Sequence, residues 1–335
     1  MSLKRFDAED FVVSSDSITS TLWSTDAPTL TNFFTSSIQE AGSSGTYYLS
    51  IFQTGSNDED AAVQFDIVYC DSVGSGSTWF NSIVPGNSPT KTMFGQYRSL
   101  ILEDENANFI FGSGNNTLIG DHFWVISLER ARYKESLFPG SLNLVLSGSG
   151  GQINLTDNSN DSTINNFQGT SRVFQLVSGS NGSSISGGGF VANSGSYGLV
   201  FPDLGTIILN PSAISQSINV SALRSSNTND FNNRRLYDSI ILGSSFGLNS
   251  QETITSDYIF VRTRNSEFNY STNPTFIAGS TGEIIYDEFI NNPQTYITTV
   301  GMYNDSSELL AVAKISRPLL KDFTKEALIR VKLDF

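Results

Sequence analysis

The nucleophilic and metal-binding chemistry open to this chain is narrow, because it contains one histidine and one cysteine. A Ser-His-Asp site would have to use His122, which stands between Asp121 and Phe123 before an apolar run, and no G-x-S-x-G nucleophile elbow occurs. Cys70 alone excludes an internal disulfide and any multi-cysteine metal site, and a single imidazole excludes zinc sites that need two. We expect His122 to be a strand-end residue with a structural partner.

Other polar segments that could form functional sites are also explained as ordinary turns and loops. The acidic runs Asp58–Asp60 and Glu103–Glu105 are typical of solvated turns, although a glycosidase pair formed in space stays open. Residues 157–163 place oxygen side chains as a Ca²⁺ loop would, but they lack the EF-hand glycine and bidentate acid, and Asx turns explain the same residues. The glycine runs 74–78 and 187–189 lack the lysine of a phosphate-binding loop. We therefore expect no catalytic residue, no cofactor and no metal, and a protein that is not an enzyme.

Charge narrows the range of partners. The net charge of −14 gives no general attraction to nucleic acid or anionic lipid, so neither is an expected partner. Basic residues concentrate in the last quarter of the chain, which indicates either contact between unlike ends of neighbouring subunits or ordinary solubilising charge. The first residues lack the apolar region of a signal peptide, and no run approaches the roughly 20 apolar residues of a transmembrane helix. We expect synthesis and folding in a cytoplasm.

The elements that must position these residues are mostly strands. The chain contains 24 Phe and 12 Tyr beside many Ser, Thr, Asn and Gly residues, and short alternating runs recur along it. Apolar residues at helical spacing predict short helices at 89–104 and 231–246. We expect an α+β, mainly β fold with antiparallel sheets or a sandwich, two or three short helices, and a glycine/serine-rich β insert.

Composition changes suggest three regions. Residues 1–146 are expected to form an N-terminal β-rich scaffold, and 226–335 a helix followed by a C-terminal antiparallel β region. Residues 147–225 are rich in Gly, Ser and Asn; we favour an inserted β unit that projects or contacts a neighbour, with a flexible linker as the alternative for 147–198.

The C-terminal region carries the clearest strand signals. Asn304–Ser307 joins two apolar runs and predicts a hairpin. The last run, 325–335, alternates to the terminal Phe335 and predicts a strand docked in a sheet. One face of this strand should be buried, either in this subunit's sheet or against a neighbouring subunit: Ala327, Ile329, Val331, Leu333 and Phe335. As interface residues we single out Tyr303, Leu309, Val331, Leu333 and Phe335.

Segments of this region resemble tailed-phage proteins. Thr298–Lys314 is similar to a strand "IGLY/F", an acidic turn and a strand "ELLAVA/GK" that form a hairpin in baseplate-docking domains of tail fibres. Leu319–Phe335, Glu267–Pro274 and Gly95–Arg98 resemble virion structural proteins of large contractile-tailed phages of cyanobacteria and other marine bacteria. The resemblance runs along the whole chain and is weakest in 147–198. It implies structural roles and supplies no catalytic residue.

The resemblance and the composition together predict a structural subunit of a phage tail or baseplate, located in the virion and assembled by symmetric contacts. The expected partners are other copies of the chain and other virion proteins. A receptor- or glycan-binding tail fibre or adhesin is the alternative, with a host-surface glycan as its ligand. A capsid or neck decoration protein fits less well. A glycan-degrading tailspike also fits less well, since the long repetitive β-helix patterning usual in such spikes is absent. Four aromatic residues beside Gly/Asn loops could stack on sugars in the glycan-binding alternative: Trp79, Phe80, Phe190 and Tyr197.

Overall fold

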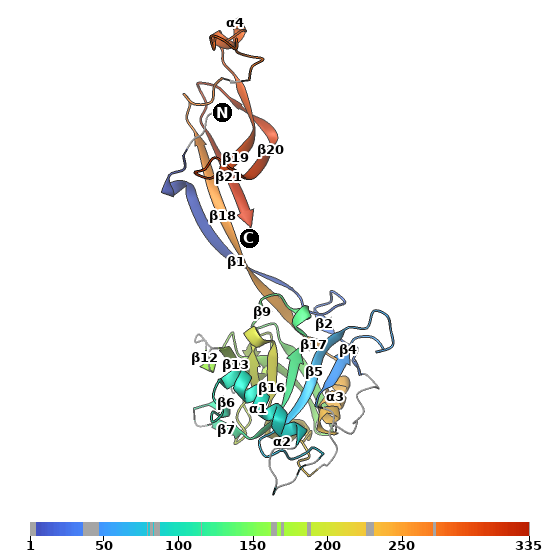
Figure 1. The fold of residues 1–335 in the computed structure, drawn as a ribbon. Coiled ribbons are helices and arrows are strands. Elements are labelled where there is room, and N and C mark those ends of the chain that lie inside the picture. Colours follow the sequence, from blue (N-terminus) through green and yellow to red (C-terminus); the bar gives the residue numbers. More distant parts are fainter. Residues whose placement is uncertain are drawn as a thin grey trace. The chain divides into compact units, whose positions relative to one another are not determined.

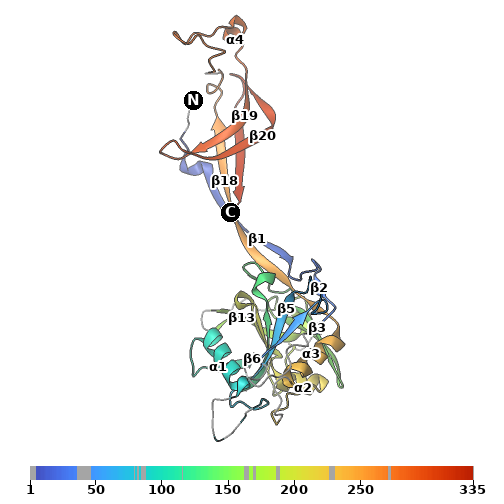
Figure 2. The ribbon, with the colours of Figure 1, turned by 45° about the vertical axis from the view of Figure 1, so that its right-hand side comes forward.

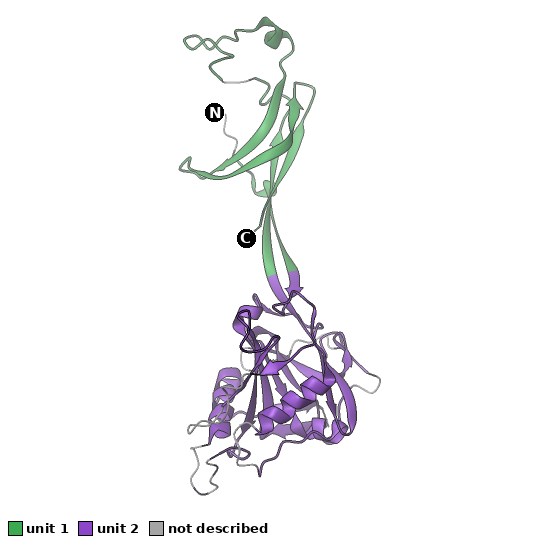
Figure 3. Cartoon of the chain, turned by 90° about the vertical axis from the view of Figure 1, so that its right-hand side faces the viewer, with its two compact units in different colours: residues 1–17, 253–335 green, residues 18–252 purple. Residues whose placement is uncertain are grey.

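The computed structural model describes residues 5–35, 47–78, 80, 83, 88–114, 116–161, 166–168, 171–185, 189–225, 231–270 and 273–334. The protein is mainly β, with antiparallel strand pairing and four α-helices in this described part, which confirms the predicted α+β class. The chain forms two compact units (Figure 3). Unit 1 comprises residues 1–17 and 253–335, and unit 2 comprises residues 18–252.

Both predicted helices are present. Helix α1 spans Pro89–Leu102 and α3 spans Phe231–Gly243, and α1 starts at a proline, which suits the first helical turn. Helix α2, Pro211–Ile218, and helix α4, Asp287–Asn291, were not predicted. Short 3₁₀ turns lie at η1 Ala8–Asp10, η3 Arg130–Arg132 and η4 Pro202–Leu204. Among the described residues, no helix combines the length and the apolar character that a membrane span requires.

Unit 2 contains one large sheet of short antiparallel strands. The strands are β2 Thr29–Leu30, β3 Phe34–Thr35, β4 Leu49–Phe52, β5 Val63–Asp71, β8 His122–Leu128, β10 Asn143–Gly148, β11 Gly151–Asp157, β12 Asn166–Gln168, β13 Ser171–Ser180, β14 Ser183–Ser184, β15 Gly198–Phe201, β16 Thr206–Leu209 and β17 Phe246–Gly247. Their order is β2-β17-β10-β11-β13-β15-β16-β8-β5-β4-β3, and β12 and β14 pair with β13. Two further strands, β6 Phe109–Ser113 and β7 Asn116–Gly120, form a hairpin, and β9 Ser136–Leu137 pairs with residues 250–251.

The large sheet curls on itself (Figures 1 and 2). Strands β2 and β3 stand at opposite ends of the strand order, yet only residues 31–33 separate them in the chain. Four Cα–Cα steps span at most about 15 Å, so the two edges of the sheet must approach each other. The side chain of Phe33, in this connection, is buried in the core that the curl encloses.

Alternation along the strands gives the sheet two apolar faces. Trp124 and Ile126 of β8 join a core that includes residues of α2 and α3. Phe123 and Val125 of the same strand join a second core, which α1 and the β6–β7 hairpin cover. Both faces of the sheet are therefore packed, which explains the nearly continuous apolar run in β8.

The glycine-rich region is part of this sheet. Residues 147–225 contribute β11, β13, β15 and β16, which lie in the middle of the strand order. The structure thus divides the chain differently from the composition: the expected borders at 146/147 and 225/226 both lie inside unit 2. Glycine here allows close packing, since a Cβ on Gly198 would overlap the backbone oxygen of Ile208 in the neighbouring strand.

Unit 1 contains two layers of strands. One layer has the order β1-β18-β21 and consists of residues 11–17 of β1 (Phe11–Thr21), residues 253–263 of β18 (Asn249–Thr263) and β21 (Ala327–Asp334). Strands β19 Thr295–Tyr303 and β20 Leu309–Lys321 form a hairpin whose turn is closed by the Asn304 N–H, which donates to the Glu308 oxygen over 3.0 Å. The predicted hairpin and the predicted C-terminal strand are both confirmed.

Candidate assembly surface

His122 lies in a network of charged side chains at the ends of β5 and β8. Its Nδ1 is 2.6 Å from Asp121 Oδ1, and Arg224 bridges Asp121 Oδ2 over 3.0 Å and Asp71 Oδ2 over 2.8 Å. Asp71 is fully buried, and its Oδ1 accepts hydrogen bonds from the backbone N–H groups of residues 73–75. The network ties three loops together, and Asp121 is the structural partner expected for His122.

The pKa of Asp121 reflects this network. Burial raises it, but the hydrogen bond and charge of His122, together with Arg224, outweigh burial and hold the pKa below its usual value of 3.8. The Asp121 carboxylate therefore stays ionised, and paired with Arg224, to a lower pH than an ordinary aspartate would.

Cys70 belongs to the core beneath α1. It has no exposed surface and packs in the same cluster as Phe123 and Val125. Burial raises the pKa of its thiol well above the usual value, so the thiol stays protonated and is a poor nucleophile.

The described part of the 157–163 segment consists of Asx-type turns. Asp157 Oδ1 accepts from the Ser159 N–H over 3.1 Å, and both carboxylate oxygens accept from the Gly140 N–H over 2.9 Å. Asp161 Oδ2 accepts from the Ser184 N–H over 2.6 Å, while residues 162–163 lie outside the described part. No group of three or more His, Cys, Asp or Glu that could hold a metal occurs among the described residues.

The four aromatic residues considered for sugar stacking differ in exposure. Tyr197 is buried in the core, and its hydroxyl lies 2.7 Å from the Ser217 Oγ, which corrects the expectation that its ring could stack on a sugar. Phe80 and Phe190 are half-buried, and Trp79 lies outside the described residues.

The residues predicted for the interface are divided between the core and the surface of unit 1. Val331 is 5% exposed and forms the small core of this unit with Ile259 and Met302, and Leu333 packs against it. Leu309 is 53% exposed at the start of β20, and Tyr303 is half-buried at the end of β19. Phe335 lies outside the described residues. The described part of β21 alternates as expected, with residues 327, 329, 331 and 333 less exposed than their neighbours.

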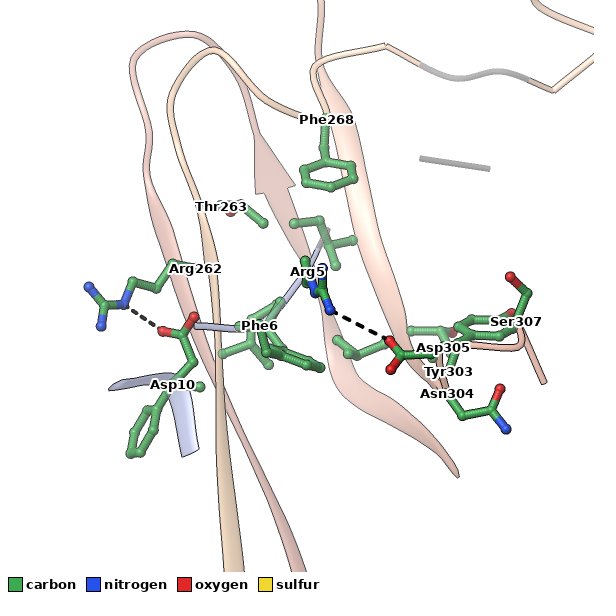
Figure 4. Close-up of a pocket in the computed structure, with 17 residues that line it drawn as sticks. Arg5, Phe6, Asp10, Arg262, Thr263, Phe268, Tyr303, Asn304, Asp305 and Ser307 are labelled. Carbon is green, nitrogen blue, oxygen red and sulfur yellow. Dashed lines mark ion pairs between the residues drawn. The ribbon is translucent and has the colours of Figure 1, made fainter. Parts of the chain in front are cut away.

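A pocket of about 690 Å³ lies in unit 1, lined by β18, β19, the hairpin turn and the N-terminal segment (Figure 4). Arg262 Nε is 3.0 Å from Asp10 Oδ1, and this pair fixes η1 beside β18. Arg5 is 4.0 Å from Asp305, but both side chains are almost fully exposed, so this ion pair contributes little. The pocket is thus a groove between the strand layers that the chain's own N-terminal segment partly fills.

The most buried charged group of unit 1 is Lys321, at the end of β20. Its side chain has no exposed surface, and Nζ donates to Asn265 O over 3.0 Å, to Asn269 Oδ1 over 2.8 Å and to Asp322 O over 2.9 Å. Three protein oxygens thus take the place of the water molecules that would hydrate the Lys321 ammonium group in solvent. These hydrogen bonds anchor the loop after β18 to the end of the β19–β20 hairpin.

The two units differ sharply in how much apolar surface they bury. Among the described residues, 46 apolar side chains are buried in unit 2 and three in unit 1. Each unit exposes 15 large apolar side chains, but unit 1 has 100 residues and unit 2 has 235, so exposed apolar side chains are denser in unit 1. Strand β1 has ten of its eleven residues exposed, including Phe11, Val12 and Val13 in succession. Strand β20 exposes Leu309, Leu310 and Val312. Unit 1 therefore presents the candidate assembly surface.

Sequence reasoning missed part of this surface. The segment 273–294 was not assigned a role, although one signal was available: no Lys or Arg occurs from residue 265 to residue 313, while Phe, Tyr and Ile are frequent there. A scan against family models, a search of curated proteins and a search of solved structures each found no match for the chain.

Proposed function

We propose that this protein is a non-enzymatic structural subunit of a bacteriophage virion, in the tail or baseplate, which assembles with copies of itself and with neighbouring virion proteins. The phage assignment rests on the resemblance of the C-terminal hairpin and strand to tail proteins. The assembly mechanism rests on one observation, the contrast between the well-filled core of unit 2 and the thin core of unit 1.

The energetics of unit 1 support assembly through this unit. Burying a large apolar side chain contributes about 1.5–3 kcal/mol relative to leaving it exposed. Among the described residues, unit 1 buries three apolar side chains, so its own core contributes little to its stability. Contacts that cover its 15 exposed apolar side chains would add burial of this kind.

The location is tested on purified phage particles. Quantitative mass spectrometry of particles and of isolated tails should find the chain in both, at a fixed number of copies per particle. Absence of the chain from purified particles would contradict the virion assignment.

The assembly mechanism is tested with the full chain. The double variant Leu310→Ser/Val312→Ser, on β20, should lose self-association in sedimentation velocity. Ile119→Ser is the matched control, because Ile119 is an equally exposed strand residue of unit 2, at 62% against 68% for Leu310. Equal loss of association in both variants would count against unit 1 as the assembly surface.

A further inference from the structure

We propose that residues 273–294 of one copy, termed here the acidic lobe, dock on the outer face of β20 in a second copy. This inference rests on the proposed assembly through unit 1 and names the two surfaces that meet. The outer β20 face is defined by Leu310, Val312 and Lys314.

The acidic lobe connects β18 to β19 and has no buried residue. It is held by a bridge between Ile277 and Ile284 and by Phe276, whose ring centroid is 5.7 Å from that of Tyr286 and 5.5 Å from that of Phe289. Its outer side chains are apolar and exposed: Ile285 at 54%, Tyr286 at 53% and Ile290 at 58%. A segment with this composition is stabilised when another surface covers it.

The charge of the lobe has one sign. Glu283, Asp287 and Glu288 lie within it, and no Lys or Arg occurs anywhere between residues 265 and 313. Its partner should therefore be apolar and basic.

The outer β20 face has this chemistry. Leu310 is 68% exposed, Val312 is 58% exposed, and Lys314 continues the same row two residues on. The intervening Ala311 and Ala313 point to the opposite side and pack against the core of unit 1, which fixes the direction of the exposed row. Arg317 lies further along β20, past Lys314 where the pairing with β19 becomes irregular, and adds a second exposed positive charge to the strand.

A second copy is the occupant that these observations favour. Within one chain both surfaces are exposed, so they do not cover each other. The surfaces are complementary in charge and different in identity, so the contact is heterologous: each copy offers its lobe to one neighbour and its β20 face to another. Repetition of such a contact closes a ring or extends a fibre.

Charge reversal tests the pairing. Lys314→Glu/Arg317→Glu in the full chain should weaken self-association by roughly tenfold, and so should Glu283→Lys/Asp287→Lys/Glu288→Lys. A chain that carries both sets should recover most of the lost affinity. Lys134→Glu, an exposed lysine of unit 2, controls for net charge and should leave association unchanged. No recovery in the combined variant would overturn the pairing.

Mixing two variants, one altered in the acidic lobe and one in the outer β20 face, distinguishes a heterologous contact from a symmetric one. A lobe variant, Ile285→Ser/Ile290→Ser, and a face variant, Leu310→Ser/Val312→Ser, should each be monomeric alone. Mixed, they should form a one-to-one dimer and nothing larger, since the pair retains one intact lobe and one intact face.

The outcomes separate this proposal from the proposed function. A parent chain that stays monomeric at all concentrations, and is absent from particles, would contradict both. A parent chain that assembles while the lobe variant also assembles would overturn the docking alone. Far-ultraviolet circular dichroism of each variant confirms that the exposed substitutions leave the fold intact.

Discussion

At the scale of single residues, Lys321 links separate segments of unit 1 through three oxygen acceptors. Lys321→Met keeps the aliphatic stem but leaves the buried acceptors without a donor. We expect a loss of about 1–3 kcal/mol in the stability of unit 1, measured by denaturant unfolding, and faster hydrogen exchange in residues 264–270. Lys325→Met is the control, since the Lys325 side chain is half-exposed and its ion pair with Asp322 should contribute little. Equal effects of the two substitutions would contradict the anchoring role.

The charged network around His122 predicts an acid-sensitive contribution to stability. The pKa of Asp121 is lower in the folded chain than its ordinary value, so its ionised form favours folding above about pH 4, and this contribution is lost as the pH falls through the folded pKa. The melting temperature of the parent should therefore decline more steeply with acid than that of Asp121→Asn. Arg224→Gln should flatten the profile in the same way. Parallel profiles of parent and Asp121→Asn below pH 4 would show that the network does not stabilise the fold.

At the scale of elements, helices and hairpins with local sequence signals could be predicted, but the pairing of strands distant in the chain could not. The hairpin around Asn304–Ser307 and the helix 89–104 depend on turn residues and on a 3.6-residue period, which act within a few residues. Helix α2 was not predicted because three serines interrupt the apolar positions Ala213, Ile214 and Ile218 and weaken the helical periodicity. An N-terminal cap was nevertheless present in the sequence: the Asn210 side chain accepts a hydrogen bond from the Ser212 N–H. The place of the glycine-rich region in the sheet depends on partners far away in the chain, such as β16 beside β8, and no local pattern encodes it.

The surface residues were only partly predictable for the same reason. Alternation placed Val331 and Leu333 on the buried face of β21, as observed. It could not show that unit 1 leaves β1 and the outer β20 face uncovered, because exposure depends on what the rest of the chain supplies.

Glycine substitutions test the position of the glycine-rich region. Gly198→Ala places a methyl group against the backbone of Ile208 in the middle of the sheet, and we expect it to destabilise unit 2 by about 2 kcal/mol or more. Gly95→Ala, in the interior of α1, meets no atom within 4 Å and should stabilise the chain by about 0.5–1 kcal/mol. Urea unfolding compares the two; a neutral Gly198→Ala would place this segment outside the sheet.

Deletion of residues 331–335 tests the C-terminal strand. It removes Val331, Leu333 and the ladder to residues 256–259 of β18, and truncation of even one large core side chain usually costs about 2–5 kcal/mol. Unit 1 should become sensitive to protease while unit 2 stays resistant. Lys332→Ser, on the exposed face, should behave like the parent. A deleted chain with the parent's proteolytic pattern would mean that β21 is dispensable.

At the scale of the whole molecule, our proposal distinguishes a unit that is stabilised by its own core from a unit that gains stability from contacts to other chains. Unit 2 fills two apolar clusters on the faces of one curled sheet. Unit 1 has one small cluster and a large apolar surface. On the proposed function, unit 2 supplies stability and unit 1 supplies the assembly contacts.

Hydrogen–deuterium exchange of the full chain, compared between free protein and assembled particles, tests this division most directly. We predict strong additional protection in β1, in β20 and in residues 273–294 on assembly, with little change in α1 and the β6–β7 hairpin of unit 2. Protection confined to unit 2, with unit 1 exchanging equally in both states, would contradict the account.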